Sequence, residues 1–288
     1  MRSMRWNEWF FSAAVLCLLA LAASAAPGAQ DRGEGKLDSA EPQGITPQEI
    51  IERFAAKEKQ FKLAREQYTY RQQVTVQTLD GGTVDGEYRM VSDILFDDKG
   101  RRIEQVVFAP QSTLTRIMMT KEDLDDFRNQ LPFVLTSDEI PEYSILYVGQ
   151  QPEDELQTYV FDVAPKRIEK GKRYFQGRIW VDNQDFQVVK TQGITLPQIH
   201  NKRNENLFPK FTTYREQVDG LYWFPVYTRA DDVLHFKDED VHVREILKYT
   251  NYKRFGSNVK ILYQGEEVEK APGNGPPGDQ GQAPAPHK

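Results

Sequence analysis

Residues 156–193 read LQTYVFDVAPKRIEKGKRYFQGRIWVDNQDFQVVKTQG and carry the clearest strand pattern of the chain. The stretch contains three strand-like runs: Leu156–Ala164, Tyr174–Val181 and Phe186–Gly193. The polar residues 182–185 (Asp-Asn-Gln-Asp) separate the last two runs and are typical of a hairpin loop. The stretch therefore predicts two successive antiparallel hairpins.

A loop of this length fixes which residues of the second hairpin face each other. The predicted pairs are Val181 with Phe186, Ile179 with Val188 and Gly177 with Lys190. Because opposite residues share a face, these pairs make one face mostly apolar. The other face carries Trp180, Arg178, Gln187 and Val189. A sheet with one strongly apolar face needs a cover on that face.

Residues 1–25 have the pattern of a secretory signal peptide. Arg2 and Arg5 precede an apolar run from Trp9 to Ala23, and Ala23-Ser24-Ala25 is a small-x-small cleavage site. The run is shorter than the ~20 residues that a spanning helix needs. The residues before Cys17 make a poor lipobox. We therefore expect cleavage near Ala25 and a soluble exported protein without a lipid anchor.

The composition excludes several classes of function. The only cysteine, Cys17, leaves with the signal peptide, so the mature chain has no disulfide, thiolate nucleophile or cysteine metal site. The removed segment carries a net +1, which takes the charge of −6 to −7. A protein this acidic, without a basic domain, is not expected to bind nucleic acid.

The remaining chain is expected to hold one domain at residues 45–263. Residues 26–44 are rich in Gly, Pro and charge and predict a disordered leader. Residues 264–288 predict a disordered Pro/Gly-rich tail for the same reason. No repeat of fixed period divides the roughly 220 residues between them, a length typical of a single domain.

The domain opens with a helix and continues as strands. Thr46-Pro47-Gln48-Glu49 is a capping box, followed by an apolar stripe at helical spacing up to about Arg65. Period-two patterns then predict strands, and Pro225 should lie at an edge or a bulge. The further strands are predicted at Tyr68–Leu79, Glu87–Phe96, Ile103–Phe108, Thr113–Met119, Tyr143–Gly149, Lys210–Gln217, Tyr222–Leu234 and Val241–Phe255.

About ten or eleven strands exceed what a flat sheet accommodates, which predicts strong curvature or partial closure. The predicted class is α+β, with a strongly curved antiparallel sheet (an incomplete β-barrel) and helices over its concave face. Residues 120–142 interrupt the strands with roughly two short apolar helices. They either pack on the sheet or form a movable lid, and the sequence favours packing.

The order of strands places two basic loops at one end of the sheet. Their residues are Lys166, Arg167, Lys170, Lys172 and Arg173 in the first loop, and Lys202 and Arg203 in the second. The acidic residues 238–240 should meet them there. One interpretation is a basic rim for anionic headgroups or a partner protein. The other, which we favour for a charge run, is solvated loops that pair with one another.

These features together resemble the LolA-type family of outer-membrane lipoprotein-sorting proteins. The resemblance rests on the signal peptide, the capped helix, the strand YTYRQQVTVQ and the hairpins YVFDV…YFQGRIWVDNQDFQVVKTQG. It is strongest at RIWVD followed by FQVVK. The family implies an incomplete β-barrel plugged by helices, with a hydrophobic cavity for acyl chains of lipoproteins or lipids. Its closing arginine would correspond to Arg71 or Arg89.

Two functional hypotheses follow. The first is a periplasmic carrier or chaperone, expected to be a monomer, that binds lipoprotein acyl chains or lipid for outer-membrane sorting and meets inner- or outer-membrane transport components. The second is a periplasmic interaction or envelope-sensor module that binds a protein without lipid. The predicted cavity residues, which would equally form a dry core, are Tyr70, Val74, Val76, Tyr88, Met90, Ile94, Phe96, Phe127, Leu131 and Phe133.

No sequence motif indicates an enzyme. The chain has no G-x-S-x-G, H-E-x-x-H, P-loop or G-x-G-x-x-G pattern. Asp231, Asp232, His235 and His242 could be imagined as a metal or acid–base site, but their spacing matches no metal motif. We interpret them as solvated edge charges and expect neither a cofactor nor a metal.

Overall fold

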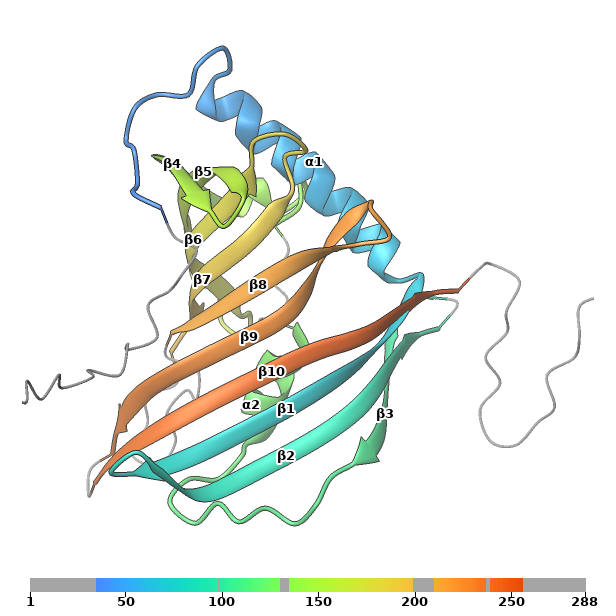
Figure 1. Cartoon of the computed structure of the whole chain (residues 1–288), viewed down its shortest axis with the longest axis vertical. Helices are drawn as coiled ribbons and strands as arrows, with labels where there is room; N and C mark the ends of the chain where they lie inside the picture. Colours follow the sequence, from blue (N-terminus) through green and yellow to red (C-terminus); the bar gives the residue numbers. More distant parts are fainter. Residues whose placement is uncertain (1–34, 98, 130–134, 199–209, 237–238, 256–288) are drawn as a thin grey trace, which may run out of the picture.

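The computed structural model describes residues 35–97, 99–129, 135–198, 210–236 and 239–255. In this part of the chain, ten strands form one antiparallel sheet in the order β3-β2-β1-β10-β9-β8-β7-β6-β5-β4 (Figure 1). The sheet is open, with β3 and β4 as its two edges. The α+β class and an open antiparallel sheet of about ten strands are therefore as predicted.

The elements follow one another in an almost unbroken meander. Their bounds are α1 (Pro47–Arg65), β1 (Tyr68–Asp80), β2 (Thr83–Phe96), β3 (Arg102–Phe108), α2 (Lys121–Asn129), the 3₁₀ turn η1 (Ile140–Glu142), β4 (Tyr143–Glu153), β5 (Leu156–Pro165), β6 (Tyr174–Asp182), β7 (Val188–Leu196), β8 (Phe211–Val218), β9 (Tyr222–His235) and β10 (Asp240–Arg254).

Helix α1 begins at the predicted capping box. The Glu49 amide donates to the Thr46 hydroxyl (3.2 Å), and the Glu49 carboxylate accepts from the Thr46 amide (2.9 Å). The apolar stripe of α1 then packs on the sheet, where the rings of Phe54 and Phe161 lie 5.7 Å apart. This contact belongs to the main apolar core, which joins α1, α2 and one face of the sheet.

A buried ion pair also ties α1 to the sheet. Arg215 of β8 donates to both carboxylate oxygens of Glu58, at 2.7 and 3.3 Å, and both side chains are almost fully buried. Burial raises the pKa of Glu58, although the Arg215 charge opposes that rise. Next to Arg215, the register of β8 and β9 shifts where Pro225 lies, as the proline predicted.

The predicted register of β6 and β7 is wrong by two residues or more. Val181 pairs with Val188, Ile179 with Thr191 and Gly177 with Gly193, with an irregularity after Trp180. The loop is longer than predicted because the Asp182 carboxylate accepts amide hydrogen bonds from residues 184 and 185 (3.2 and 3.0 Å) and holds them out of the ladder. The apolar face is preserved, since Ile179, Val181 and Val188 still face the main core.

Two other expectations differ from the structure. Residues 113–119 form no strand, and their contact with the sheet includes one backbone hydrogen bond from Thr113 to Glu87 (2.9 Å). Residues 35–40, assigned to a disordered leader, instead run beside the edge strand β4 (Figure 1). We call residues 35–40 the N-terminal segment.

The signal peptide at 1–25, the rest of the leader up to residue 34 and the tail at 264–288 lie outside the described residues. Within the described ranges, neither helix has the length and apolar character needed to cross a membrane.

Candidate functional site

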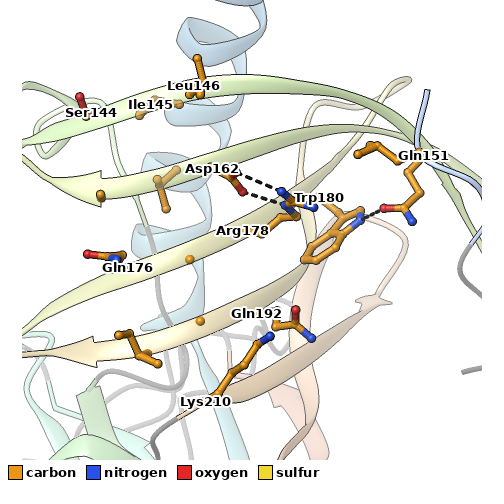
Figure 2. Close-up of a pocket in the computed structure, with 16 residues that line it drawn as sticks. Ser144, Ile145, Leu146, Gln151, Asp162, Gln176, Arg178, Trp180, Gln192 and Lys210 are labelled. Atoms are coloured by element: carbon orange, nitrogen blue, oxygen red, sulfur yellow. Dashed lines mark hydrogen bonds and ion pairs between the residues drawn. The ribbon is translucent and has the colours of Figure 1, made fainter. Parts of the chain in front are cut away.

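A groove of about 1020 Å³ lies across strands β4 to β7 (Figure 2). Cross-strand pairing places Leu146, Asp162, Arg178 and Gln192 in one row, because each is opposite the next. Their neighbours along the strands, such as Val163 and Ile179, face the main core and α1. Since side chains alternate between faces, the row lies on the face opposite α1.

Charged and amide groups line this groove. Arg178 donates two hydrogen bonds to the Asp162 carboxylate (2.7 and 3.0 Å), and Figure 2 shows the two side chains pointing toward each other. Gln176 and Gln192 add amide groups, and Lys210 adds a cation at the β7 side. Leu146, on the edge strand, is 68% exposed and is the most accessible apolar side chain of the lining.

One end of the groove rests on a second apolar cluster, formed by Val160, Trp180 and Val189 on the face opposite α1. The Trp180 ring nitrogen donates to the Gln151 side-chain oxygen (2.8 Å). Beside it, the buried Lys190 ammonium pairs with Glu153 (3.0 Å) and lies 4.8 Å from the Trp180 ring centre. This hydrogen-bonded base gives Trp180 a fixed orientation.

Two glycines face each other beneath the groove. Gly177 is opposite Gly193, and a Cβ atom at Gly193 would lie 2.3 Å from the Gln176 carbonyl oxygen. A Cβ atom at Gly177 would lie 2.1 Å from the carbonyl oxygen of residue 192. The two strands therefore approach here in a way that only glycine permits.

The predicted cavity residues lie elsewhere, on the face of the sheet that carries the main core. The pairs Val74–Met90, Val76–Tyr88 and Tyr70–Ile94 are opposite each other on β1 and β2, so they share a face as predicted. Val74, Val76 and Ile94 are fully buried, and Phe127 of α2 is 1% exposed. None of the predicted cavity residues lines the groove. Phe96 is half-buried, and Leu131 and Phe133 lie outside the described residues.

Neither candidate for the closing arginine faces that interior. Arg71 donates to Asp93 across the β1–β2 pair at 2.8 and 2.9 Å, and Arg89 lies 3.6 Å from Glu87. Both alternate with residues of the main core, so they lie on the opposite face. The carboxylates that these two arginines bind belong to β2, and neither belongs to α2.

The predicted basic rim is only partly a free surface. Lys166, Arg167, Lys170 and Lys172 are exposed, but Lys172 pairs with Glu169 of the same loop (2.8 Å). Arg173 instead binds the buried Asp126 of α2. Glu239, from the acidic loop, pairs with Arg116 (3.0 Å) rather than with the basic loop. Lys202 and Arg203 lie outside the described residues.

The histidine and aspartate set forms surface pairs. His242 contacts Asp231, which also accepts from Arg244 (2.8 Å), and His235 lies 2.9 Å from Asp240. Although burial raises the pKa of Asp231, its hydrogen bonds to Arg244 and His242 lower it overall. Across the described ranges, no three His, Cys, Asp or Glu side chains come together as a metal site.

An acidic interior lies beneath α2, on the face of the sheet that carries the main core. Asp123 and Asp126 of α2 are buried, and Glu245 of β10 is fully buried in the same region. Among the described residues, neither carboxyl oxygen of Glu245 has a hydrogen-bond partner. Burial raises the pKa of Glu245 well above its ordinary value, and the charges of Asp123 and Asp126 add to that rise.

Sequence reasoning missed the groove because it expected a cover on the apolar face of the Leu156–Gly193 stretch and assigned no function to the mixed face. The sequence feature that could have indicated the groove is the pair of opposite charges, Asp162 and Arg178, at facing positions of adjacent strands. Trp180 lies beside them on the same face. A bidentate ion pair fixes two charged side chains in place, and a tryptophan beside it supplies a large apolar surface, so the two together suit a binding surface.

The described part of the chain is thus an open antiparallel sheet with a helix on one face and a groove on the other. No protein-family model and no curated protein matches the chain. Among solved structures it is similar to a LolA superfamily protein from Nitrosomonas europaea, with 14% identity and a TM-score of 0.32 over 74% of this chain and 95% of that one.

Two structures of MucB are also similar. MucB in complex with MucA(peri) has 11% identity and a TM-score of 0.21, over 70% of this chain and 93% of that one. The Pseudomonas aeruginosa MucA/MucB complex has 10% identity and the same TM-score and coverage. The LolA-like resemblance found in the sequence is thus also found among solved structures.

Proposed function

We propose that this protein is a non-enzymatic binding module of the periplasm that engages a polypeptide partner through the groove of β4–β7. The observation behind this proposal is that the groove lies on β4–β7 and not among the predicted acyl-chain residues. The groove measures about 1020 Å³, whereas the predicted acyl-chain residues Val74, Val76 and Phe127 are packed into the main core. Export to the periplasm rests on the signal-peptide pattern of residues 1–25.

The chemistry of the groove suits a polypeptide better than an acyl chain. Gln176 offers an amide donor and an amide acceptor, as a backbone peptide unit requires, and Gln192 offers its acceptor beside an amide nitrogen that donates to Thr212 (3.2 Å). The Asp162–Arg178 pair adds charged groups, and Leu146 adds apolar surface. An acyl chain would remove these polar groups from water without replacing their hydrogen bonds, which costs free energy.

Site-specific photo-crosslinking tests the proposal. A photoreactive phenylalanine at Leu146 should give a polypeptide adduct in cells that export the protein, and Arg178→Glu should remove that adduct. The same probe at Leu63, an exposed leucine of α1 (61% exposed), is the matched control and should give none. Equal adducts at both positions, or an adduct at Leu146 that ignores Arg178→Glu, would contradict the proposal.

One observation favours a lipid carrier as the second candidate. Tyr70 and Tyr88 pack against the main core and stay only half-buried, so the apolar surface of the core continues onto side chains that are partly accessible. Binding there would gain about 0.8 kcal/mol per CH₂ buried. Native mass spectrometry of the protein purified from membranes would support this candidate by a co-purifying lipid or acylated peptide, and a clean apo mass would argue against it.

A further inference from the structure

The N-terminal segment of the chain binds along the edge of the sheet that β4 forms. The Asp38 amide donates to the Gln150 carbonyl (2.8 Å), and the Gln150 amide donates to the Asp38 carbonyl (2.7 Å). The Gly35 amide donates to the Pro152 carbonyl (2.8 Å). These bonds include one antiparallel bridge, between Asp38 and Gln150, and hold residues 35–38 against the edge of β4.

Side chains of the sheet also contact residues 35–38. The Gln151 amide nitrogen donates to the Gly35 carbonyl (2.8 Å), while its oxygen accepts from Trp180. Leu37 packs against the second apolar cluster and lines the groove, whereas Lys36 and Asp38 are exposed. A Cβ atom at Gly35 would lie 2.8 Å from the Pro152 ring. The edge therefore selects a glycine and, two residues later, an apolar side chain.

Further along β4, the edge is not paired with another strand in the described part of the chain, although the Tyr147 hydroxyl donates to the Ala40 carbonyl (3.0 Å). Residues 144–148 form no backbone hydrogen bond on the side away from β5 with any residue in the described ranges. Ser144, Ile145 and Leu146 from this stretch line the groove. An extended peptide longer than the four-residue occupant would thus gain both ladder hydrogen bonds and contacts in the groove.

We propose that the β4 edge binds an extended segment of a partner protein with the pattern glycine–any residue–leucine-like residue, and that residues 35–38 are a tethered competitor which this segment displaces. The proposal rests on the proposed partner binding and specifies its mode. Tethering gives the chain's own segment a high effective concentration, so only a longer or better-fitting strand replaces it.

A peptide-binding experiment on the full chain tests this inference. The probe is a fluorescein-labelled heptapeptide with the sequence of residues 35–41, Gly-Lys-Leu-Asp-Ser-Ala-Glu, followed by fluorescence anisotropy. Leu37→Asp in the protein weakens the tethered segment, so the probe should bind this variant at least tenfold more tightly than it binds the wild type. A probe with aspartate in place of its leucine is the matched control and should not bind.

The double variant Leu37→Asp/Gln151→Leu should bind the probe no more tightly than the wild type does. Its residue 151 can no longer donate a hydrogen bond to the carbonyl of the probe's glycine, as Gln151 does to Gly35. Equal probe affinity for wild type and Leu37→Asp, with unchanged circular dichroism, would overturn the inference. So would a dimer of Leu37→Asp that does not bind the probe, since the edge would then belong to a second copy. The probe reports on the edge and the Leu146 crosslink reports on a partner in cells, so either proposal can fail without the other.

Discussion

Replacing Glu245 with glutamine is expected to remove a loss of stability that the wild-type protein suffers as the pH rises. Glu245 is fully buried, and its carboxyl oxygens have no hydrogen-bond partner among the described residues. Burial raises its pKa well above the ordinary value, and Asp123 and Asp126 of α2 raise it further. Arg173 binds Asp126, so it offsets part of the negative charge that faces Glu245.

The sign follows from where the proton is held more tightly. A raised pKa means that the folded state keeps the Glu245 proton to a higher pH than the unfolded chain does. The stability contributed by this group is complete below the unfolded pKa of about 4.3 and is lost as the pH rises toward the folded pKa. Between the two values the folded state holds one extra proton, so the free energy of unfolding falls by about 1.4 kcal/mol per pH unit.

Urea denaturation of both proteins, at one-unit steps from about pH 4.5 to about pH 7.5, measures this effect. Glu245→Gln should gain stability relative to wild type at each step until the folded pKa is passed. Other titrating groups, such as Glu58, are present in both proteins and largely cancel in the difference. Glu216→Gln, at an exposed position of β8, is the control and should show no such trend. A pH-independent difference between Glu245→Gln and wild type would refute the reasoning.

Three further predictions concern the framework. Glu58→Ala leaves the buried Arg215 guanidinium without its carboxylate and should cost about 3–5 kcal/mol in urea denaturation, whereas replacing both residues by apolar ones should cost much less. Gly193→Ala places a Cβ atom 2.3 Å from the Gln176 carbonyl and should lower stability by roughly 1–3 kcal/mol, measured by thermal unfolding. Thr46→Ala removes the α1 cap and should cost about 1 kcal/mol in urea denaturation, while Thr46→Ser should be nearly neutral.

The sequence predicted most elements of the fold because their signals are local. The capping box placed the start of α1 at the observed residue, and strict alternation placed β1 within one residue of its observed end. The register of β6 and β7 was not predictable in the same way. It depends on Asp182 folding its own loop, a side-chain interaction that competes with the ladder and leaves no mark on the hydrophobic pattern.

The candidate site could not be predicted because it depends on long-range placement. The residues assigned to a cavity share one face, as alternation indicates, but only packing shows that Val74 and Val76 are fully buried in the main core. The N-terminal segment has a composition typical of disorder, and its order comes from contacts with β4, more than a hundred residues away. The composition of residues 35–40 does not reveal that the edge strand β4 supplies their hydrogen-bond partners.

Around Trp180, strands β5 and β6 are buried on both faces, and this explains why the chain must keep this part of the sheet covered. Val160 and Phe161 are consecutive and both fully buried, as are Ile179, Trp180 and Val181 within a few per cent, so these strands lack a solvent face at this point. Helix α1 covers one side, and Leu37 of the N-terminal segment helps to cover the other. Displacing that segment exposes the Trp180 cluster to water unless the incoming strand supplies an apolar side chain at the same place. The requirement for a leucine-like residue is therefore a consequence of how the sheet is packed, which is why the aspartate-substituted probe should fail even where all of its backbone hydrogen bonds can form.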